Sequence, residues 1–317
     1  SLLIVSLVIF FSVSLLPGSY ASAILGQNAT PEAVAAMEEK LGLNEPALWR
    51  YILWLGAAAT GDLGQSFAGR PVMTVLGPRL LNTITLAAVT AVIAVPLAIV
   101  LGVICARFRG KFIDRFLSTS TLASISLPEF FVAYIVMMVF AVKLQWFPSM
   151  AGIRNSMDFG EQLYRMVLPI LTLLLVILAH MVRNTRAAIL SVMASPYVEM
   201  ARLKGESEGR VVMRQALPNA IGPIASVVAL NLAYLISGVV VIEVVFVYPG
   251  VGQAMIDAVR NRDVPVIQAC ALIFATAYIG LNLLADVISI VSNPRLLHPR
   301  HEGYPAPAHP RPPRPDP

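Results

Sequence analysis

The chain contains 317 residues, of which 57% are hydrophobic and only 13% are charged, and its mean hydropathy is +0.75. About a quarter of the residues in an ordinary soluble domain are charged, so this composition excludes a soluble globular protein and indicates an integral membrane protein. The formal net charge of +5 then concerns loops and topology, and we do not interpret it as a nucleic-acid-binding surface.

Six apolar stretches follow one another along the chain. A helix needs ~20 residues to cross ~30 Å of hydrocarbon, and all stretches but the first reach that length. The first stretch is short and does not start with a methionine, so we expect the numbering to begin inside a helix that is retained in the protein. The alternative is a signal peptide, since Ala21-Ser22-Ala23 resembles a cleavage site. The stretches are 2–16, 81–106, 119–142, 167–190, 221–245 and 268–292.

Lysine and arginine counts predict the orientation. Nine lie in the connections 17–80, 143–166 and 246–266, and fourteen lie in the shorter connections 106–118 and 183–218 and in the tail 293–317. Basic residues concentrate on the cytoplasmic side, so both termini are expected to be cytoplasmic. The predicted fold is an all-α polytopic membrane protein with six transmembrane helices.

This reading divides the chain into four parts. The first transmembrane helix takes residues 1–16, and an extracytoplasmic loop with short helices takes 17–80. A five-helix core takes 81–292, with a cytoplasmic loop at 195–220. The tail 293–317 has a proline every second or third residue, so we expect it to be disordered.

The extracytoplasmic loop contains two predicted helices. Thr30 can cap a helix with Pro31 at its first position, and Gly42 can end it. A second helix can start at Asn44 and Pro46. Its apolar side could form a lid over the outer mouth or lie at the level of the lipid headgroups, and the sequence leaves both open. That side carries Trp49, Ile52, Leu53 and Trp54.

Few residues in the apolar stretches suggest chemistry. Cys105 and Cys270 fall at opposite ends of their helices, too far apart for a disulfide, and we interpret both as small apolar residues. No metal-ligand spacing occurs, and His180, one turn before Arg183, is expected to be packed or water-facing rather than a ligand.

Two carboxylates fall in or beside the predicted spans, where an ionised acid costs roughly 2.5–3.5 kcal/mol unless it faces a partner or water. Glu243, near Pro249-Gly250, could line the pathway or gate, or it could brace the Tyr248–Gly252 turn together with Arg260 and Arg262. Glu129 follows Pro128 at the expected inner start of the third helix, and we interpret it as a boundary residue.

The polar stretch that begins at Tyr197 predicts a short amphipathic helix. Ser195 and Pro196 fit its start, Glu199 lies in its first turn, Arg202 and Lys204 lie in its last turn, and Gly205 suits its end. Tyr197, Ala201 and Gly205 share one nearly bare face, which another protein could approach closely. A second short helix from Ser207 is expected to stop at Leu217-Pro218. The stretch could be a docking element or only a solvated loop with snorkelling arginines.

The same stretch resembles the EAA loop of binding-protein-dependent ABC importer permeases, whose pattern reads E-A-A-x3-G-x9-I-x-L-P. Glu199, Ala201, Gly205, Leu217 and Pro218 fit the pattern, and Met200 and Gln215 depart from it. The stretches "LGLNEPALWRYILWL", "GDLGQS", "NTITLA", "RNTRAAIL" and "VIEVVFVYPGVGQAMIDAVRNRDVPVIQA" resemble the dipeptide/oligopeptide permease B type. The resemblance covers residues 15–297, although Pro17-Gly18-Ser19 and Asn293 depart from the usual residues.

The resemblance implies a type I ABC importer permease fold in the bacterial cytoplasmic membrane. It also implies a heterodimer with a second homologous permease, two ATP-binding subunits and an extracytoplasmic solute-binding protein. The ATPase-coupling residues would be Tyr197, Glu199, Ala201, Arg202, Lys204, Gly205, Leu217 and Pro218. The chain has no G-x4-G-K-[ST] sequence, so ATP and Mg²⁺ are expected on the partner ATPase chains and no cofactor on this one.

Three alternatives stay open at this point. The same machinery could carry haem or nickel chelates instead of peptides. A secondary transporter would show paired inverted repeats, and no internal repeat is visible. An intramembrane protease would show Gly-x-Ser-x-Gly, His-Glu-x-x-His or paired membrane aspartates, and none occurs.

Overall fold

The computed structural model describes residues 2–14, 20–26, 29–40, 42, 44–154 and 157–292. Within these ranges every named element is a helix, and the extended backbone is limited to one isolated bridge between Gln65 and Pro71. The proline-rich tail and Pro17-Gly18-Ser19 lie outside the described residues.

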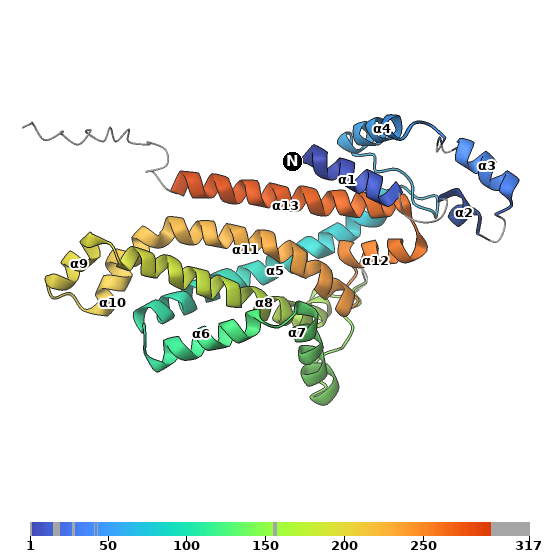
Figure 1. Cartoon of the computed structure of the whole chain (residues 1–317). Coiled ribbons are helices and arrows are strands. Elements are labelled where there is room, and N and C mark those ends of the chain that lie inside the picture. Colours follow the sequence, from blue (N-terminus) through green and yellow to red (C-terminus); the bar gives the residue numbers. More distant parts are fainter. Residues whose placement is uncertain are drawn as a thin grey trace, which may run out of the picture.

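Four long apolar helices form the body of the molecule: α5 (Val72–Arg107), α8 (Phe159–Met193), α11 (Leu217–Val245) and α13 (Val264–Ser292). They run roughly alongside one another in Figure 1. By length and composition each can cross a membrane, and the count of candidate spans rises to five when one bent helix pair is included. In the most apolar part of α8, 56% of the residues are buried, against 28–39% in the other three, so α8 is the central helix.

The third predicted span is not one straight helix. It consists of α6 (Phe112–Ile125) and α7 (Glu129–Val136), which continues into the π-helical segment η2 (Met137–Lys143). The two parts meet at an angle of 106°. Pro128 explains the break, since proline disfavours helical geometry at the residue before it and has no N–H to donate. The prediction of a single helix over 119–142 is therefore wrong.

Of the N-terminal helices, α1 packs beside α13. The helix α1 (Leu2–Ser14) spans about 20 Å at 1.5 Å per residue, which is less than the hydrocarbon thickness. The short α2 (Tyr20–Leu25) precedes α3 (Pro31–Lys40), and α4 (Ala47–Ala59) follows. Thr30 caps α3 as predicted, because its Oγ1 accepts from the Ala33 N–H at 3.3 Å, and Gly42 has a left-handed φ of +64°.

The helix α4 is held to α1 by contacts between aromatic side chains, with Tyr51 and Trp54 of α4 both against Phe10. Tyr51 is buried against Phe10, and its hydroxyl lies 2.8 Å from Ser6 Oγ. The opposite side of α4 leaves large apolar side chains exposed, as a helix at headgroup level would. These exposed residues are Leu48, Trp49, Ile52 and Leu53.

The two ends of the bundle differ. One end carries α2 to α4 and α12 (Val251–Asn261), and the other carries α9 (Pro196–Leu203) and α10 (Glu208–Arg210) (Figure 1). The loop before α8 belongs to the α12 end, since the Ala151 N–H donates to Phe246 O at 2.8 Å. The connections that the charge count grouped together therefore lie together.

Candidate functional site

The α9 loop begins and ends as the sequence predicts. Pro196 occupies the first helical position, Glu199 lies in the first turn and Arg202 in the last. Gly205 has a φ of +82°, which favours glycine, and the Glu206 N–H donates back to Ala201 O at 3.2 Å. The backbone thus turns sharply after one short helix.

The exposed face of α9 differs from the predicted one. Ala201 is buried, because it packs with Val198 and Val211 in a small apolar cluster beneath the helix. The prediction that Tyr197, Ala201 and Gly205 share one open face is therefore wrong. Instead, Tyr197, Met200 and Leu203 are exposed, Leu203 to 76%. The loop therefore presents an edge of large apolar side chains, which the predicted face of small residues does not include.

Ionic contacts join α9 to the segment that follows. Arg202 pairs with Glu208 at 3.1 Å, although both side chains are well exposed, while Lys204 is exposed beside them. At the end of α5, the Arg107 guanidinium packs over Gly209, where an added Cβ would lie 3.2 Å from Nη2. One ionic contact thus joins α9 to α10, and Arg107 of α5 packs against α10.

The predicted helix stop at Leu217-Pro218 is wrong. The helix runs without interruption from Glu208 through the π-helical segment η3 (Val211–Ala216) into α11. The wider π turn relieves the clash that Pro218 would cause in a regular α-helix. In addition, the Asn219 side-chain amide donates to Gln215 O at 2.7 Å. The α9 loop therefore continues directly into a membrane-spanning helix.

The same segment is packed onto two further spans. Buried residues of η3 and α11 form one apolar cluster with the end of α5 and with α8. The cluster comprises Ala106, Ala188, Ile189, Met193, Val212, Ala216, Ala220 and Ile224.

At the α12 end, Glu243 is fully buried and forms the centre of a hydrogen-bonded turn. It accepts from Thr83 Oγ1 at 2.6 Å and from the Gly252 N–H at 2.7 Å. Thr83 Oγ1 in turn accepts from the Val251 N–H at 2.9 Å. A Cβ at Gly250 would overlap the carboxylate, so the glycine leaves it room. The carboxylate faces the protein, which favours the bracing alternative.

Two further contacts close this turn. The Asn82 amide donates to Pro249 O at 2.9 Å, and the Tyr248 hydroxyl donates to Asn82 O at 3.0 Å. Burial and the nearby Glu243 carboxylate raise the pKa of Tyr248 above its usual range, so the phenol stays a neutral donor. The exposed Arg260 and Arg262 are not partners of Glu243 among the described residues, so their predicted share in the brace is wrong.

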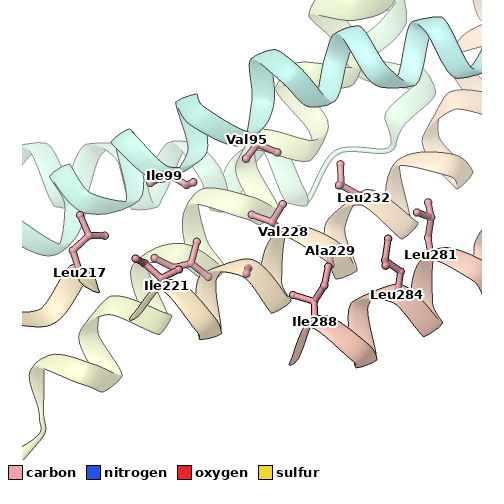
Figure 2. Close-up of a pocket in the computed structure, with 12 residues that line it drawn as sticks. Val95, Ile99, Leu217, Ile221, Val228, Ala229, Leu232, Leu281, Leu284 and Ile288 are labelled. Carbon is pink, nitrogen blue, oxygen red and sulfur yellow. The ribbon is translucent and has the colours of Figure 1, made fainter. Parts of the chain in front are cut away.

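An apolar groove of about 520 Å³ lies between α5, α11 and α13 (Figure 2). Every residue that lines it is aliphatic, including Val95, Ile221 and Leu284. It offers no polar group to a hydrophilic solute. Among the described residues no three His, Cys, Asp or Glu side chains come close enough to share a metal ion.

Known proteins resemble the chain along nearly its whole length. The family described as "Binding-protein-dependent transport system inner membrane component" matches residues 98–298, and its N-terminal companion matches residues 1–87. A probable peptide ABC transporter permease protein of Sinorhizobium fredii is 35% identical, covering 92% of this chain and 94% of its own length. The glutathione transport system permease protein GsiC of Escherichia coli is 34% identical, covering 93% and 94%. The chain therefore belongs to the inner membrane components of binding-protein-dependent transport systems, as a multi-pass permease subunit of an ABC importer.

Proposed function

We propose that this subunit forms half of the pathway by which an ATP-driven importer carries peptides into the cell, the other half being a second homologous permease. The names of the relatives, a peptide permease and a glutathione permease, support this class of cargo. We also propose that the subunit is coupled to ATP hydrolysis through α9. The observation that supports this coupling is the exposed apolar edge of α9, on a loop that packs against three membrane-spanning helices.

The orientation follows from the charge count. Fourteen of the 23 basic residues belong to the α9 end or to the tail, so we place that end and both termini in the cytoplasm, with six crossings in the whole protein. The α12 end, with α2 to α4, then faces the extracytoplasmic solute-binding protein.

The α9 helix would seat in a cleft on an ATP-binding subunit. Large apolar side chains exposed on a charged cytoplasmic loop mark a protein contact. Met200 and Leu203 would enter the cleft, while Arg202, Lys204 and Glu199 would fix the register at its rim. Closure of the two ATPase subunits would then push α9, and the continuous helix from Glu208 would carry the displacement into α11.

ATP and Mg²⁺ would be bound by the partner subunits, so this chain carries out no bond chemistry. The chain lacks the glycine-rich phosphate loop with its lysine. Its contribution is mechanical: Leu217 and Pro218 mark where the coupling segment becomes a membrane helix.

The test is reconstitution of the complex that co-purifies with this chain into proteoliposomes. With the binding protein loaded with radiolabelled alanine peptides of two to five residues, ATP should drive uptake, and ATP should be hydrolysed in step. Uptake driven by an ion gradient without ATP would contradict the importer. ATP-driven uptake of haem or a nickel chelate, with no peptide uptake, would contradict the peptide cargo.

A further inference from the structure

Glu129 lies inside the membrane-spanning bundle rather than at its boundary. It begins α7, next to the 106° bend, and a Cβ added to Gly238 of α11 would lie 3.3 Å from Glu129 Oε2 and 3.5 Å from Leu173 of α8. Gly238 lies seven residues before the end of α11, and Leu173 lies far from either end of α8. The prediction of a boundary residue is therefore wrong.

The Glu129 carboxylate lacks a partner in the described part of the chain. It is neither fully buried nor hydrogen-bonded there, and no basic side chain pairs with it. An acid in this position is costly unless it meets a cation or water. This differs from Glu243, whose two oxygens are both occupied by donors of the protein.

A group of polar side chains on α8 lies nearer the cytoplasmic end, on the side of the helix that Leu173 marks. Leu173, His180 and Asn184 are spaced by seven and eleven residues and therefore share one side of the helix. Leu173 is buried and lies, like Glu129, beside Gly238 of α11, but His180 and Asn184 are exposed, as is Arg183 beside them. These are three exposed polar side chains on the most buried of the four long helices, where lipid tails could not solvate them.

The residues that pack beside these side chains show how far they lie from the end of the bundle. Thr185 packs on Gly102 of α5, where an added Cβ would lie 2.6 Å from Thr185 Cγ2, and Gly102 lies five residues before the end of α5. Arg183 also borders a cavity of about 170 Å³ whose lining includes the hydroxyl residues Ser118 and Thr121. Polar side chains thus line this side of α8 from His180 toward the cytoplasmic end of the bundle, and the apolar Val176 and Ile177 separate them from Leu173.

We propose that Glu129, His180, Arg183 and Asn184 line the translocation pathway on this subunit. Resting on the peptide cargo proposed above, Glu129 receives the protonated amino group of a peptide in transit, and Arg183 receives its carboxylate. Glu129 lies near the level of Leu173, and Arg183 is ten residues further along α8, so the two charges are about 15 Å apart along the helix at 1.5 Å per residue. Charge-assisted hydrogen bonds of this kind replace the water that the peptide termini lose.

Cysteine accessibility tests the pathway independently of the cargo. In the assembled complex with Cys105 and Cys270 replaced by alanine, His180→Cys and Asn184→Cys should react with a charged thiosulfonate reagent. Leu175→Cys is the matched control, since Leu175 is 42% exposed on another side of the same helix and should face lipid. Equal reaction at all three positions, or reaction at Leu175 alone, would overturn the proposed lining.

A transport assay tests the proposed role of the Glu129 carboxylate. With saturating loaded binding protein, Glu129→Gln should slow uptake of radiolabelled tetra-alanine about tenfold, as expected for losing one hydrogen bond to a charged group. Glu129→Asp should restore most of the uptake, and ATP hydrolysis stimulated by the binding protein should persist in both variants. Parent-like uptake by Glu129→Gln, or equal loss of uptake and thermal stability, would overturn the assignment. If the parent complex carries no peptide at all, the proposed cargo fails instead, and the labelling result still decides the pathway.

Discussion

The Arg186 guanidinium donates a hydrogen bond to each carboxylate oxygen of Asp114, from Nε to Oδ1 at 2.7 Å and from Nη2 to Oδ2 at 2.9 Å. The pair ties the first turn of α6 to α8, and the Gly110 N–H adds a third hydrogen bond to Asp114 at 2.9 Å. Its carboxylate side chain is only 4% exposed. The bent α6–α7 pair is therefore anchored to the central helix at the α9 end of the bundle.

We expect Asp114→Ala to lower the stability of the purified complex by about 3 kcal/mol, because it leaves a half-buried guanidinium without its acceptor. The melting temperature in detergent should fall clearly. Glu161→Ala is the control, since it removes the exposed i, i+4 pair with Arg165 and should cost about 0.5 kcal/mol or less. Equal melting temperatures for the two variants would contradict the anchoring.

Glu243→Gln should destabilise the Tyr248–Gly252 turn without changing the choice of substrate. Glutamine has one acceptor oxygen in place of two, so either Thr83 or the Gly252 N–H loses its partner, at about 1–3 kcal/mol. Thermal unfolding of the complex and competition among peptides of different charge would be measured together. A changed peptide preference with unchanged stability would mean that the carboxylate meets the substrate.

Gly252→Ala probes the same turn through packing. An added Cβ would lie 2.8 Å from Val240 Cα, a backbone atom that can move only together with α11, so the variant should lose about 1–3 kcal/mol. Gly280→Ala, in the middle of α13 with open space around the new methyl group, should be neutral or slightly stabilising. Unfolding midpoints of the two variants that coincide would rule out the close approach.

Hydrophobic length and turn chemistry predicted the elements whose causes are local. The four long spans, the Thr30 cap of α3 and the α9 helix bounded by Pro196 and Gly205 all follow from residues within a few positions of one another. The 106° bend was also signalled locally by Pro128. Hydrophobic length alone does not reveal such a bend, because the apolar stretch continues past it.

Contacts between distant residues could not be predicted in this way. The burial of Ala201 depends on Val211, and Glu129 lies against Gly238, more than a hundred residues later in the chain. In the loop between α4 and α5, Ser66 donates to Asp263 at 2.5 Å, and no pattern in the single sequence joins those two positions. Which face of a helix is open is decided by such pairings, so the sites depended on the structure more than the elements did.

The orientation can be checked with engineered cysteines in intact cells. Cysteines at Glu45 and Met150, both exposed at the α12 end, should react with a membrane-impermeant thiol reagent. Cysteines at Lys111 and Ser207, exposed at the α9 end, should react only after the cells are made permeable. The reverse pattern would place α9 outside the cell, where no ATPase could reach it.

The coupling of α9 to ATP hydrolysis is tested most directly at Leu203, which is 76% exposed and is not one of the buried residues that form the apolar cluster beneath the helix. Leu203→Asp should leave membrane insertion and pairing with the second permease intact, while it places a charge where an apolar cleft is expected. Leu203→Met, which keeps the apolar contact, is the matched control. The measurement is the stimulation of ATP hydrolysis by loaded binding protein in reconstituted complexes. We predict that stimulation is lost in Leu203→Asp, with or without release of the ATPase subunits, and is retained in Leu203→Met. Full stimulation in Leu203→Asp would contradict the claim that α9 joins this permease to its ATPase.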